Sequence, residues 1–333
     1  MSQVQNGKAF EYAIAKAYFD FLQTRSVLVE WIQNDALTNA CACFESFSSQ
    51  EQSTFLEAAQ QTIQTLLIVE PALYLPFKNE PLNIELASDA AGIDGDVRDI
   101  IFSRTQGRKN WEIGFSAKNN HEAVKHSRLS STINFGEKWL GIPCSTTYMN
   151  TASDHFSALI ESRGKPWNTL YETDSEKQRC LYVPILEAFK LELFRLYETH
   201  GSLVPQAMLK YLIGRKPFYK IIKDDRHNQV VVKAFNVENG LNKKTSNRVQ
   251  PHKVQSIHLP EKIISLDFAP DSQTTLLLVL DKGWQISLRI HTASSRIETS
   301  LKFDINLIGN PPILFTQHLF SGTLSPQLPI SQG

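Results

Sequence analysis

Residues 111–118 read WEIGFSAK, and apolar side chains alternate strictly with other types along this stretch. Period-two alternation predicts a β-strand with one face in the core. The opposite face carries a carboxylate, a hydroxyl and an ammonium group, from Glu112, Ser116 and Lys118. This strand is therefore the point from which both the fold and the candidate chemistry are built.

The segment before this strand, GDVRDIIF at residues 95–102, places Asp99 at the start of a second apolar strand. The intervening TQGRKN at residues 105–110 is a polar turn that allows the two strands to pair as an antiparallel hairpin. We therefore expect Asp99, Glu112 and Lys118 to converge at one end of a sheet.

These three side chains fit metal-assisted hydrolysis of a phosphodiester bond. Mg²⁺ prefers carboxylate and water oxygens in octahedral geometry, polarises a phosphoryl oxygen and lowers the pKa of a bound water. A nearby lysine orients that water or stabilises charge in the transition state. The alternative is a turn of acidic residues beside a half-exposed strand, because two acids and a lysine at such a spacing also occur by chance.

The next segment, KNNHEAVKHSRLS, predicts a helix within residues 122–129. In a helix, His121, Lys125 and Arg128 fall on one basic stripe, which suits a phosphate backbone, and His126 is grouped with them. A solvated basic face is the alternative. A zinc-protease helix is excluded because its histidines must be four residues apart, whereas His121 and His126 are five apart.

Outside this region, helical and strand periodicities alternate along the chain. Helices are predicted at residues 7–23, 48–68 and 183–198, and strands at 82–86, 230–235, 263–268, 274–280, 284–291 and 301–308. The fold class is therefore mixed α/β (α+β). We expect a core at 1–150, a mainly helical connection at 151–215, a β-rich region at 216–320 and a disordered tail at 321–333.

The charge balance restricts the class of protein. The 333 residues include 34 basic (Lys and Arg) and 34 acidic residues, so a wholly basic, histone-like coat is excluded. Basic residues are instead gathered within 104–128 and 243–253, which is compatible with a local basic cleft. No apolar run approaches the roughly 20 residues that span a bilayer, and we expect a cytoplasmic protein without a membrane partner.

Several longer motifs resemble those of the HaeIII family of type II restriction endonucleases. They are GKAFEYA at 7–13, GDVRDI at 95–100, WEIGFSAKNNHEAVKHSRLS at 111–130, FGEKWLGIPCS at 135–145, IISLDFAP at 263–270 and GWQISLRIHTASSRIETSLKFDINLIG at 283–309. The resemblance implies a PD-(D/E)XK nuclease core, a mixed central sheet flanked by helices, with Mg²⁺ as cofactor. It also implies cleavage of double-stranded DNA at the palindrome GGCC, between G and C, leaving blunt ends. A palindrome favours a homodimer, and a companion DNA methyltransferase is expected.

Transferred residue by residue, the resemblance assigns roles at the predicted hairpin. Asp99 fills the first acidic position of the core and Lys118 fills the lysine position. Ser116 stands where an acid is usual, so Glu112 is the candidate for the missing carboxylate. Glu11 matches a helical glutamate that many such cores add to the metal site, and its alternative is an ordinary surface helix residue.

The C-terminal motif WQISLRIH, residues 284–291, also alternates, and Gln285, Arg289 and His291 share its polar face. Arginine can donate two parallel hydrogen bonds to O6 and N7 of guanine, so Arg289 is the first candidate for base readout. The further DNA-binding candidates are Arg296, Lys302, Lys243, Lys244 and Arg248. A solvated strand face and an ordinary soluble loop are the alternatives for these residues.

Two rival functions stay open at this point. One is a catalytically impaired nuclease-fold protein that binds DNA without cutting it, and Ser116 in the usual acidic position favours it. The other is an interaction protein without DNA, in which the acidic and lysine side chains form a satisfied surface network.

Overall fold

The computed structural model describes residues 2–75, 80–88, 96–106, 109–120, 123–243 and 253–320, apart from the side chains of 106, 109 and 123–126. The helices are α1 (Gln3–Thr24), α2 (Asp35–Glu45), α3 (Ser49–Val69), α4 (Thr146–Glu161), α5 (Asp174–Lys177), α6 (Val183–His200) and α7 (Leu203–Ile213). The strands are β1 (Val29–Trp31), β2 (Leu82–Leu86), β3 (Ile100–Gln106), β4 (Lys109–Asn119), β5 (Ala123–Ser130), β6 (Phe218–Asp224), β7 (Gln229–Phe235), β8 (Ile263–Phe268), β9 (Thr275–Leu280), β10 (Gln285–His291), β11 (Ser300–Gly309) and β12 (Thr316–Phe320).

The chain forms two compact units, each assembled from separate stretches. The first contains the described parts of Met1–His121, Gly214–Ile257 and Ile313–Gly333, and the second those of Glu122–Ile213 and His258–Pro312. The contiguous regions expected from the sequence group the chain differently, because β6, β7 and β12 join the sheet that contains the β3–β4 hairpin. The tail expected at 321–333 lies outside the described residues.

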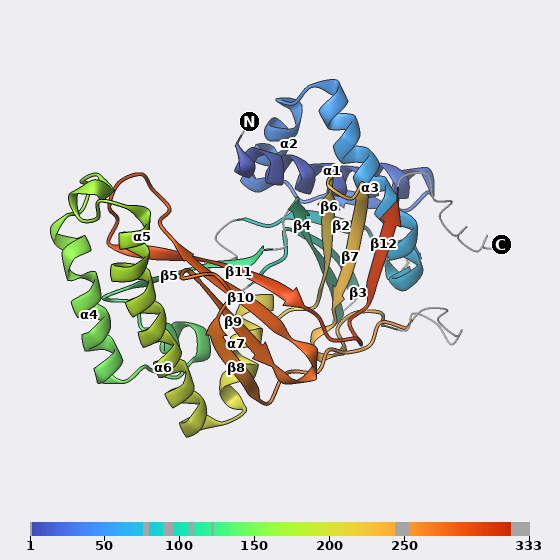
Figure 1. The fold of residues 1–333 in the computed structure, drawn as a ribbon. Helices are drawn as coiled ribbons and strands as arrows, with labels where there is room; N and C mark the ends of the chain where they lie inside the picture. Colours follow the sequence, from blue (N-terminus) through green and yellow to red (C-terminus); the bar gives the residue numbers. More distant parts are fainter. Residues whose placement is uncertain are drawn as a thin grey trace. The chain divides into compact units, whose positions relative to one another are not determined.

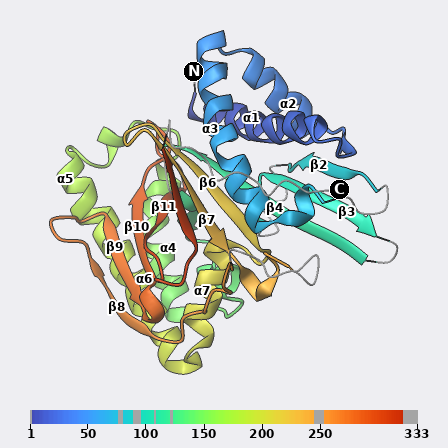
Figure 2. The same ribbon diagram turned by 90° about the vertical axis from the view of Figure 1, so that its right-hand side faces the viewer.

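Within the described residues, the first unit has a seven-stranded mixed sheet in the order β1-β2-β3-β4-β6-β7-β12. β1 pairs with β2 and β4 with β6 in parallel, and the other neighbours are antiparallel. Helices α1 and α3 pack on this sheet and α2 packs on α1 (Figure 1), while β2, β3 and β4 follow one another in the sheet (Figure 2). Ser2 and Ser48 begin α1 and α3 with capping boxes, which satisfy backbone N–H groups at each helix start.

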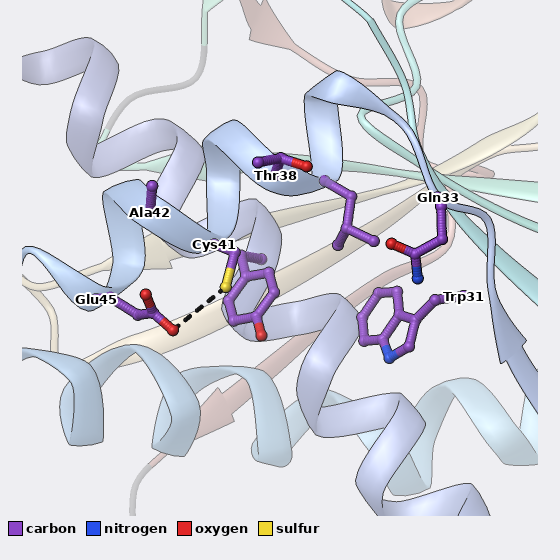
Figure 3. Close-up of a pocket in the computed structure, with 8 residues that line it drawn as sticks. Trp31, Gln33, Thr38, Cys41, Ala42 and Glu45 are labelled. Carbon is purple, nitrogen blue, oxygen red and sulfur yellow. Dashed lines mark hydrogen bonds between the residues drawn. The ribbon is translucent and has the colours of Figure 1, made fainter.

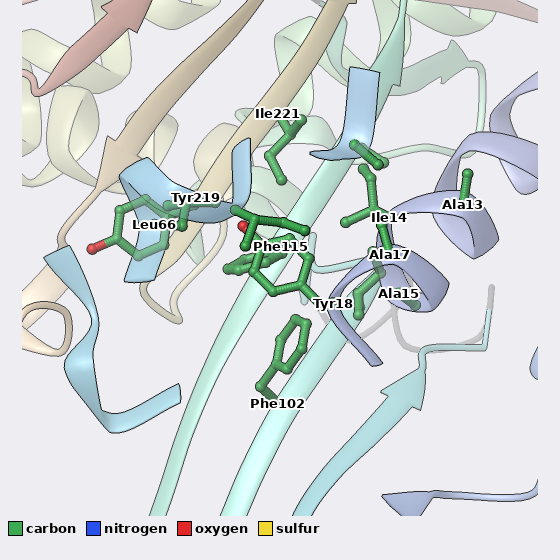
Figure 4. Packing of buried hydrophobic residues seen from close by; sticks show 14 of the residues in the cluster. Ala13, Ile14, Ala15, Ala17, Tyr18, Leu66, Phe102, Phe115, Tyr219 and Ile221 are labelled. Carbon is green, nitrogen blue, oxygen red and sulfur yellow. The ribbon is translucent and has the colours of Figure 1, made fainter. Parts of the chain in front are cut away.

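An aromatic core joins α1 to the β3–β4 hairpin (Figure 4). The ring of Tyr18 lies 5.5 Å from that of Phe102 and 5.2 Å from that of Phe115, measured between centroids. The Tyr18 hydroxyl is hydrogen-bonded to the Thr62 hydroxyl of α3 at 3.1 Å, so the buried phenol keeps a polar partner. This packing holds α1 in place against the hairpin.

The second unit has a five-stranded antiparallel sheet, β5-β11-β10-β9-β8, within the described residues. Its apolar face is covered by helices, and α4 and α6 run side by side there (Figure 1). Phe303 of β11 lies 5.5 Å from Phe189 of α6 and 6.0 Å from Trp139, between ring centroids. Burial alternates along β10 and β11, so the opposite face of the sheet is formed by their polar side chains.

The predicted helices at 7–23, 48–68 and 183–198 are confirmed as α1, α3 and α6, and the mixed α+β class and the hairpin are confirmed as well. The helix predicted within 122–129 is wrong, because this stretch is β5 and pairs with β11. Positions three residues apart lie on opposite faces of a strand, so the helical stripe expected to join Lys125 to Arg128 is wrong too, and His121 lies outside the described residues. No helix in the described ranges is long and apolar enough to cross a bilayer.

Candidate active site

The carboxylate of Asp99 is held at the entrance to β3 by donors from β4. Its Oδ2 accepts hydrogen bonds from the Ala117 backbone N–H at 2.7 Å, the Ser116 hydroxyl at 3.0 Å and Lys118 Nζ at 3.2 Å. The Asp99 N–H donates to the carbonyl of Phe115 at 2.8 Å, which continues the pairing of the hairpin. The structure therefore brings together three of the predicted catalytic residues.

Ser116 is only 2% exposed, and its hydroxyl donates to Asp99. A serine cannot supply negative charge at the usual acidic position, but it can fix the orientation of the neighbouring carboxylate. Its effect in this arrangement is therefore on the geometry of Asp99.

Glu11 of α1 approaches the same group of side chains. It is 8% exposed, and Lys8 Nζ donates to its Oε2 at 3.1 Å. Burial raises the pKa of Glu11 to about 8, and the negative charge of Asp99 acts in the same direction, whereas Lys8 and Lys118 oppose the shift. Two carboxylates and two ammonium groups thus influence one another electrostatically at this site.

Glu112, the other predicted carboxylate, belongs to a separate cluster. Its Oε1 lies 3.2 Å from Arg98 Nη1 and 3.2 Å from Lys216 Nζ. Arg98 also holds Asp96, with Nε at 2.8 Å from Oδ1 and Nη2 at 2.7 Å from Oδ2. Glu112 lies four residues before Ser116 on β4, which at the usual strand rise is about 13 Å. Its predicted role as a metal ligand therefore rests on the sequence.

Two lysines that the sequence analysis did not single out continue the row of Asp99 and Ser116 across the sheet. Ser116 pairs with Lys220 of β6, and Lys220 pairs with Lys233 of β7. Both lysines are buried, at 3% and 6% exposure. The signal that could have revealed them is a lysine inside an apolar strand, in FYKIIKD and QVVVKAF, since such lysines are rarely buried without a partner.

The polar face of the second sheet carries the candidates for base readout. Arg289 Nη2 lies 2.7 Å from Asp304 Oδ2, and His291 Nε2 lies 3.1 Å from the same oxygen. The register aligns Arg128, Lys302 and His291 across β5, β11 and β10. These side chains come from three adjacent strands of one unit.

The remaining predicted DNA-binding residues are placed as follows. Gln285, at the start of β10, and Lys243 are exposed. Arg128 donates a hydrogen bond to the Ser300 hydroxyl at 2.7 Å. Arg296 donates a hydrogen bond to the Gly164 carbonyl at 3.0 Å. His121, Lys244 and Arg248 lie outside the described residues, and so do the side chains of Lys125 and His126.

A pocket of about 430 Å³ lies elsewhere in the first unit, between α1, β1 and α2 (Figure 3). Tyr12 and Trp31 form part of its lining, and Cys41 Sγ donates to Glu45 Oε1 at 3.5 Å on its rim. None of the predicted site residues lines it. Among the described residues, no group of three or more His, Cys, Asp or Glu is arranged to hold a metal ion.

Comparison with known proteins identifies the family. The model of the HaeIII restriction endonuclease family matches residues 7–311, which include every predicted site residue. The chain belongs to the HaeIII restriction endonuclease family. The type II restriction enzyme HaeIII of Haemophilus aegyptius is 39% identical over 308 residues, covering 92% of this chain and 94% of that enzyme. No solved structure matches the chain.

Membership of the HaeIII family confirms the resemblance found in the motifs and makes the chain a site-specific deoxyribonuclease. The matched stretch contains both the hairpin with Asp99 and Lys118 and the polar face of the second sheet. Among the strands of the described residues, only β12 lies beyond it, at Thr316–Phe320.

Proposed function

We propose that the chain cuts both strands of DNA at the palindrome GGCC, between G and C, in a Mg²⁺-dependent PD-(D/E)XK active site formed by Glu11, Asp99, Ser116 and Lys118. The observation that carries the proposal is the convergence of Ala117 N–H, Ser116 and Lys118 on one oxygen of Asp99. The target and the blunt cut rest on the resemblance to the HaeIII family.

The donor set fits a hard divalent cation. Mg²⁺ is usually bound through one or two carboxylates, with waters and phosphate oxygens completing the octahedron, and Glu11 and Asp99 supply two carboxylates. Burial, and then repulsion by the Asp99 carboxylate, raise the pKa of Glu11, and a bound cation would favour the charged forms of both carboxylates. When bound, the ion supplies Lewis acidity and an activated water.

The protein side chains have distinct tasks in this proposal. Ser116 and the Ala117 N–H hold Oδ2 of Asp99, so the carboxylate is oriented before substrate arrives. Lys118 carries positive charge beside the same oxygen, where it can orient the attacking water or stabilise negative charge on the phosphate. Glu112 is kept as a sequence-based candidate for an additional carboxylate.

DNA recognition is assigned to the polar face of the second sheet and to the basic loop. Arg289, with Gln285 and His291 on the same strand, is proposed to contact guanine edges, because arginine pairs with O6 and N7. Phosphate contacts are assigned to the other basic candidates: His121, Lys125, His126, Arg128, Lys243, Lys244, Arg248, Arg296 and Lys302. A twofold dimer would place one active site on each strand of a palindrome.

The deciding experiment compares two plasmids, one with GGCC sites and one in which every GGCC has been changed, each incubated with the purified protein and Mg²⁺ or EDTA. Discrete fragments are expected only from the first plasmid with Mg²⁺, and sequencing of their ends reports the cut position. Absence of fragments from the GGCC plasmid with Mg²⁺ would refute the proposed Mg²⁺-dependent cleavage at GGCC. Expression without a GGCC methyltransferase is expected to be toxic for the same reason.

The same preparation separates the rival functions. A nuclease-fold protein that only binds DNA would prefer a GGCC duplex over a scrambled duplex and leave both plasmids intact. An interaction protein without DNA would show no salt-sensitive preference for either duplex. In the proposed enzyme, Asp99→Ala abolishes cutting while the preference for GGCC remains.

A further inference from the structure

Arg98 is a buried cation that joins two parts of the first unit, the segment before β3 and strand β4. Its side chain is 1% exposed, and it holds the carboxylates of Asp96 and Glu112 at 2.7 and 3.2 Å. Lys216, from the segment before β6, contacts the same two carboxylates, with Nζ 3.2 Å from Glu112 and 3.6 Å from Asp96. The guanidinium of Arg98 differs from this ammonium because its planar fork presents several N–H donors in a fixed orientation.

The side chain of Arg98 lies across Gly114 of β4. A Cβ atom added to Gly114 would lie 2.0 Å from Cδ and 2.4 Å from Cγ of Arg98. Both distances are far below van der Waals contact, so only glycine leaves room for the arginine. This explains the glycine that interrupts the polar face of WEIGFSAK, between Glu112 and Ser116.

This arrangement lies directly beside the proposed active site. Arg98 precedes Asp99 in the chain, and Gly114 is two residues from Ser116 on the same strand face. Asp99 stands just before the regular part of β3, where its N–H donates to the Phe115 carbonyl and its own carbonyl accepts the Ala87 N–H. These bonds hold its backbone to the sheet, and the segment Asp96–Arg98 that leads into it is anchored separately. Arg98 anchors this segment through its ion pairs with Asp96 and Glu112 and through its contact with Gly114.

We propose that Arg98, clamped between Asp96 and Glu112 across Gly114, is a positioning residue that sets the place of the Asp99 carboxylate. The inference rests on the proposed function, because it assigns Asp99 to the metal site. It gives Glu112 a task that its observed contacts support, as an anchor of Arg98. Oδ2 of Asp99 must meet three donors at once, so a small shift of the segment disrupts the site.

Arg104 of β3 offers a matched control for Arg98. Arg104 is as buried as Arg98, since each has 3% of its whole-residue surface exposed, but it donates to the backbone carbonyls of Glu80 at 3.0 Å and Leu73 at 3.2 Å. Replacing either arginine removes a buried cation, and only one replacement removes the proposed clamp.

The experiment compares Arg98→Met with Arg104→Met at a temperature where both are folded, as shown by thermal unfolding. For Arg98→Met, kcat on a GGCC plasmid is expected to fall about 100-fold, because a displacement of 1 Å has an effect of that size. The KM and the metal-free affinity for a GGCC duplex are expected to stay within about threefold. Arg104→Met is expected to lower the unfolding temperature and leave kcat within about threefold.

A second pair of variants keeps the proposal testable if Arg98→Met does not fold. Gly114→Ala is expected to lower kcat by displacing Arg98, with metal-free GGCC binding unchanged, and Glu112→Gln is expected to have a milder effect. Where Arg98→Met does fold, adding Gly114→Ala to it is expected to lower kcat no further, because the two changes act through one contact. Normal kcat in Gly114→Ala, or equal losses in the two arginine variants, would overturn the inference. A wild-type protein that fails to cut GGCC DNA would instead refute the proposed function.

Discussion

Nζ of Lys118 lies 3.2 Å from Oδ2 of Asp99, although the two residues come from opposite strands of a hairpin. The same oxygen accepts a hydrogen bond from the Ala117 N–H, so the backbone of β4 places the next residue, Lys118, beside the carboxylate. Both side chains are about one-fifth exposed, which leaves the pair accessible to a substrate phosphate.

Replacing Lys118 with methionine tests its proposed role in the chemical step. The variant keeps the aliphatic chain and removes the charge, so cleavage of GGCC DNA is expected to fall by about 10²–10³-fold. Specific binding to a GGCC duplex without metal is expected to remain, since Asp99 keeps its other two donors. Single-turnover cleavage and a binding titration measure the two effects.

Lys16→Met is the matched control for this change, because Lys16 pairs with Asp20 on the exposed surface of α1 at 2.9 Å. Its cleavage rate is expected to equal that of the wild type. Equal activity in Lys118→Met would refute the assignment of the lysine position.

Glu11→Gln tests the second carboxylate of the proposed metal site. The amide keeps the shape and the neutral side chain binds Mg²⁺ more weakly, so cleavage at limiting Mg²⁺ is expected to fall at least about a hundredfold. Raising the Mg²⁺ concentration is expected to restore part of the rate. Asp20→Asn on the same helix is the control, and a Mg²⁺ dependence identical to wild type in Glu11→Gln would exclude Glu11 as a ligand.

Much of this site could be predicted because its residues are local in sequence. Period-two alternation identified the β3–β4 hairpin, and a hairpin necessarily brings Asp99 near Ser116 and Lys118. The alternation also placed Glu112 on the same face, but it could not reveal that the nearby Arg98 and Lys216 engage it. Ion pairs formed by side chains from different segments leave no periodic signal.

The wrong helix, and the features that no local pattern predicted, have an equally physical origin. The segment of β5 contains basic residues at helical spacing, yet pairing with β11 determines its conformation. Both faces of β6 are buried, so its residues show no alternation, and it was not predicted. The two units are assembled from separate stretches, which depends on long-range strand pairing that no local pattern reports.

Glu70→Gln is expected to change the pH dependence of stability. Glu70 is 1% exposed, accepts the Tyr219 hydroxyl at 2.9 Å and also accepts the Asn242 N–H. Burial raises the pKa of Glu70 to about 7 from 4.5, so the folded state holds this proton more tightly than the unfolded state. The protonated Glu70 side chain therefore stabilises the folded state. This contribution is fully present below pH 4.5 and is lost as the pH rises through about 7.

Urea unfolding of wild type and Glu70→Gln at pH 5 and pH 8 measures this effect. The glutamine variant is expected to gain stability relative to wild type as the pH rises, by up to about 3 kcal/mol. A difference between the two proteins that is constant across this pH range would show that Glu70 titrates normally.

Arg289→Lys tests base readout by the second sheet. The lysine keeps the charge but loses the planar fork that bonds O6 and N7 of guanine, so GGCC affinity is expected to fall by about 1–3 kcal/mol. Asp304→Asn is expected to have a smaller effect in the same direction. Asp304 accepts a hydrogen bond from Nη2 of Arg289 at 2.7 Å and so restricts the orientation of the guanidinium. Titrations with GGCC and scrambled duplexes at several salt concentrations measure the change.

The salt dependence separates base readout from a phosphate contact. Because charge is conserved in Arg289→Lys, the affinity for the scrambled duplex and the slope of log affinity against log salt are expected to stay unchanged. Arg179→Lys, at an exposed position of the same unit, is the control and is expected to bind both duplexes like wild type. Equal losses of affinity for the GGCC and scrambled duplexes in Arg289→Lys would place this arginine on the DNA backbone instead of a guanine edge.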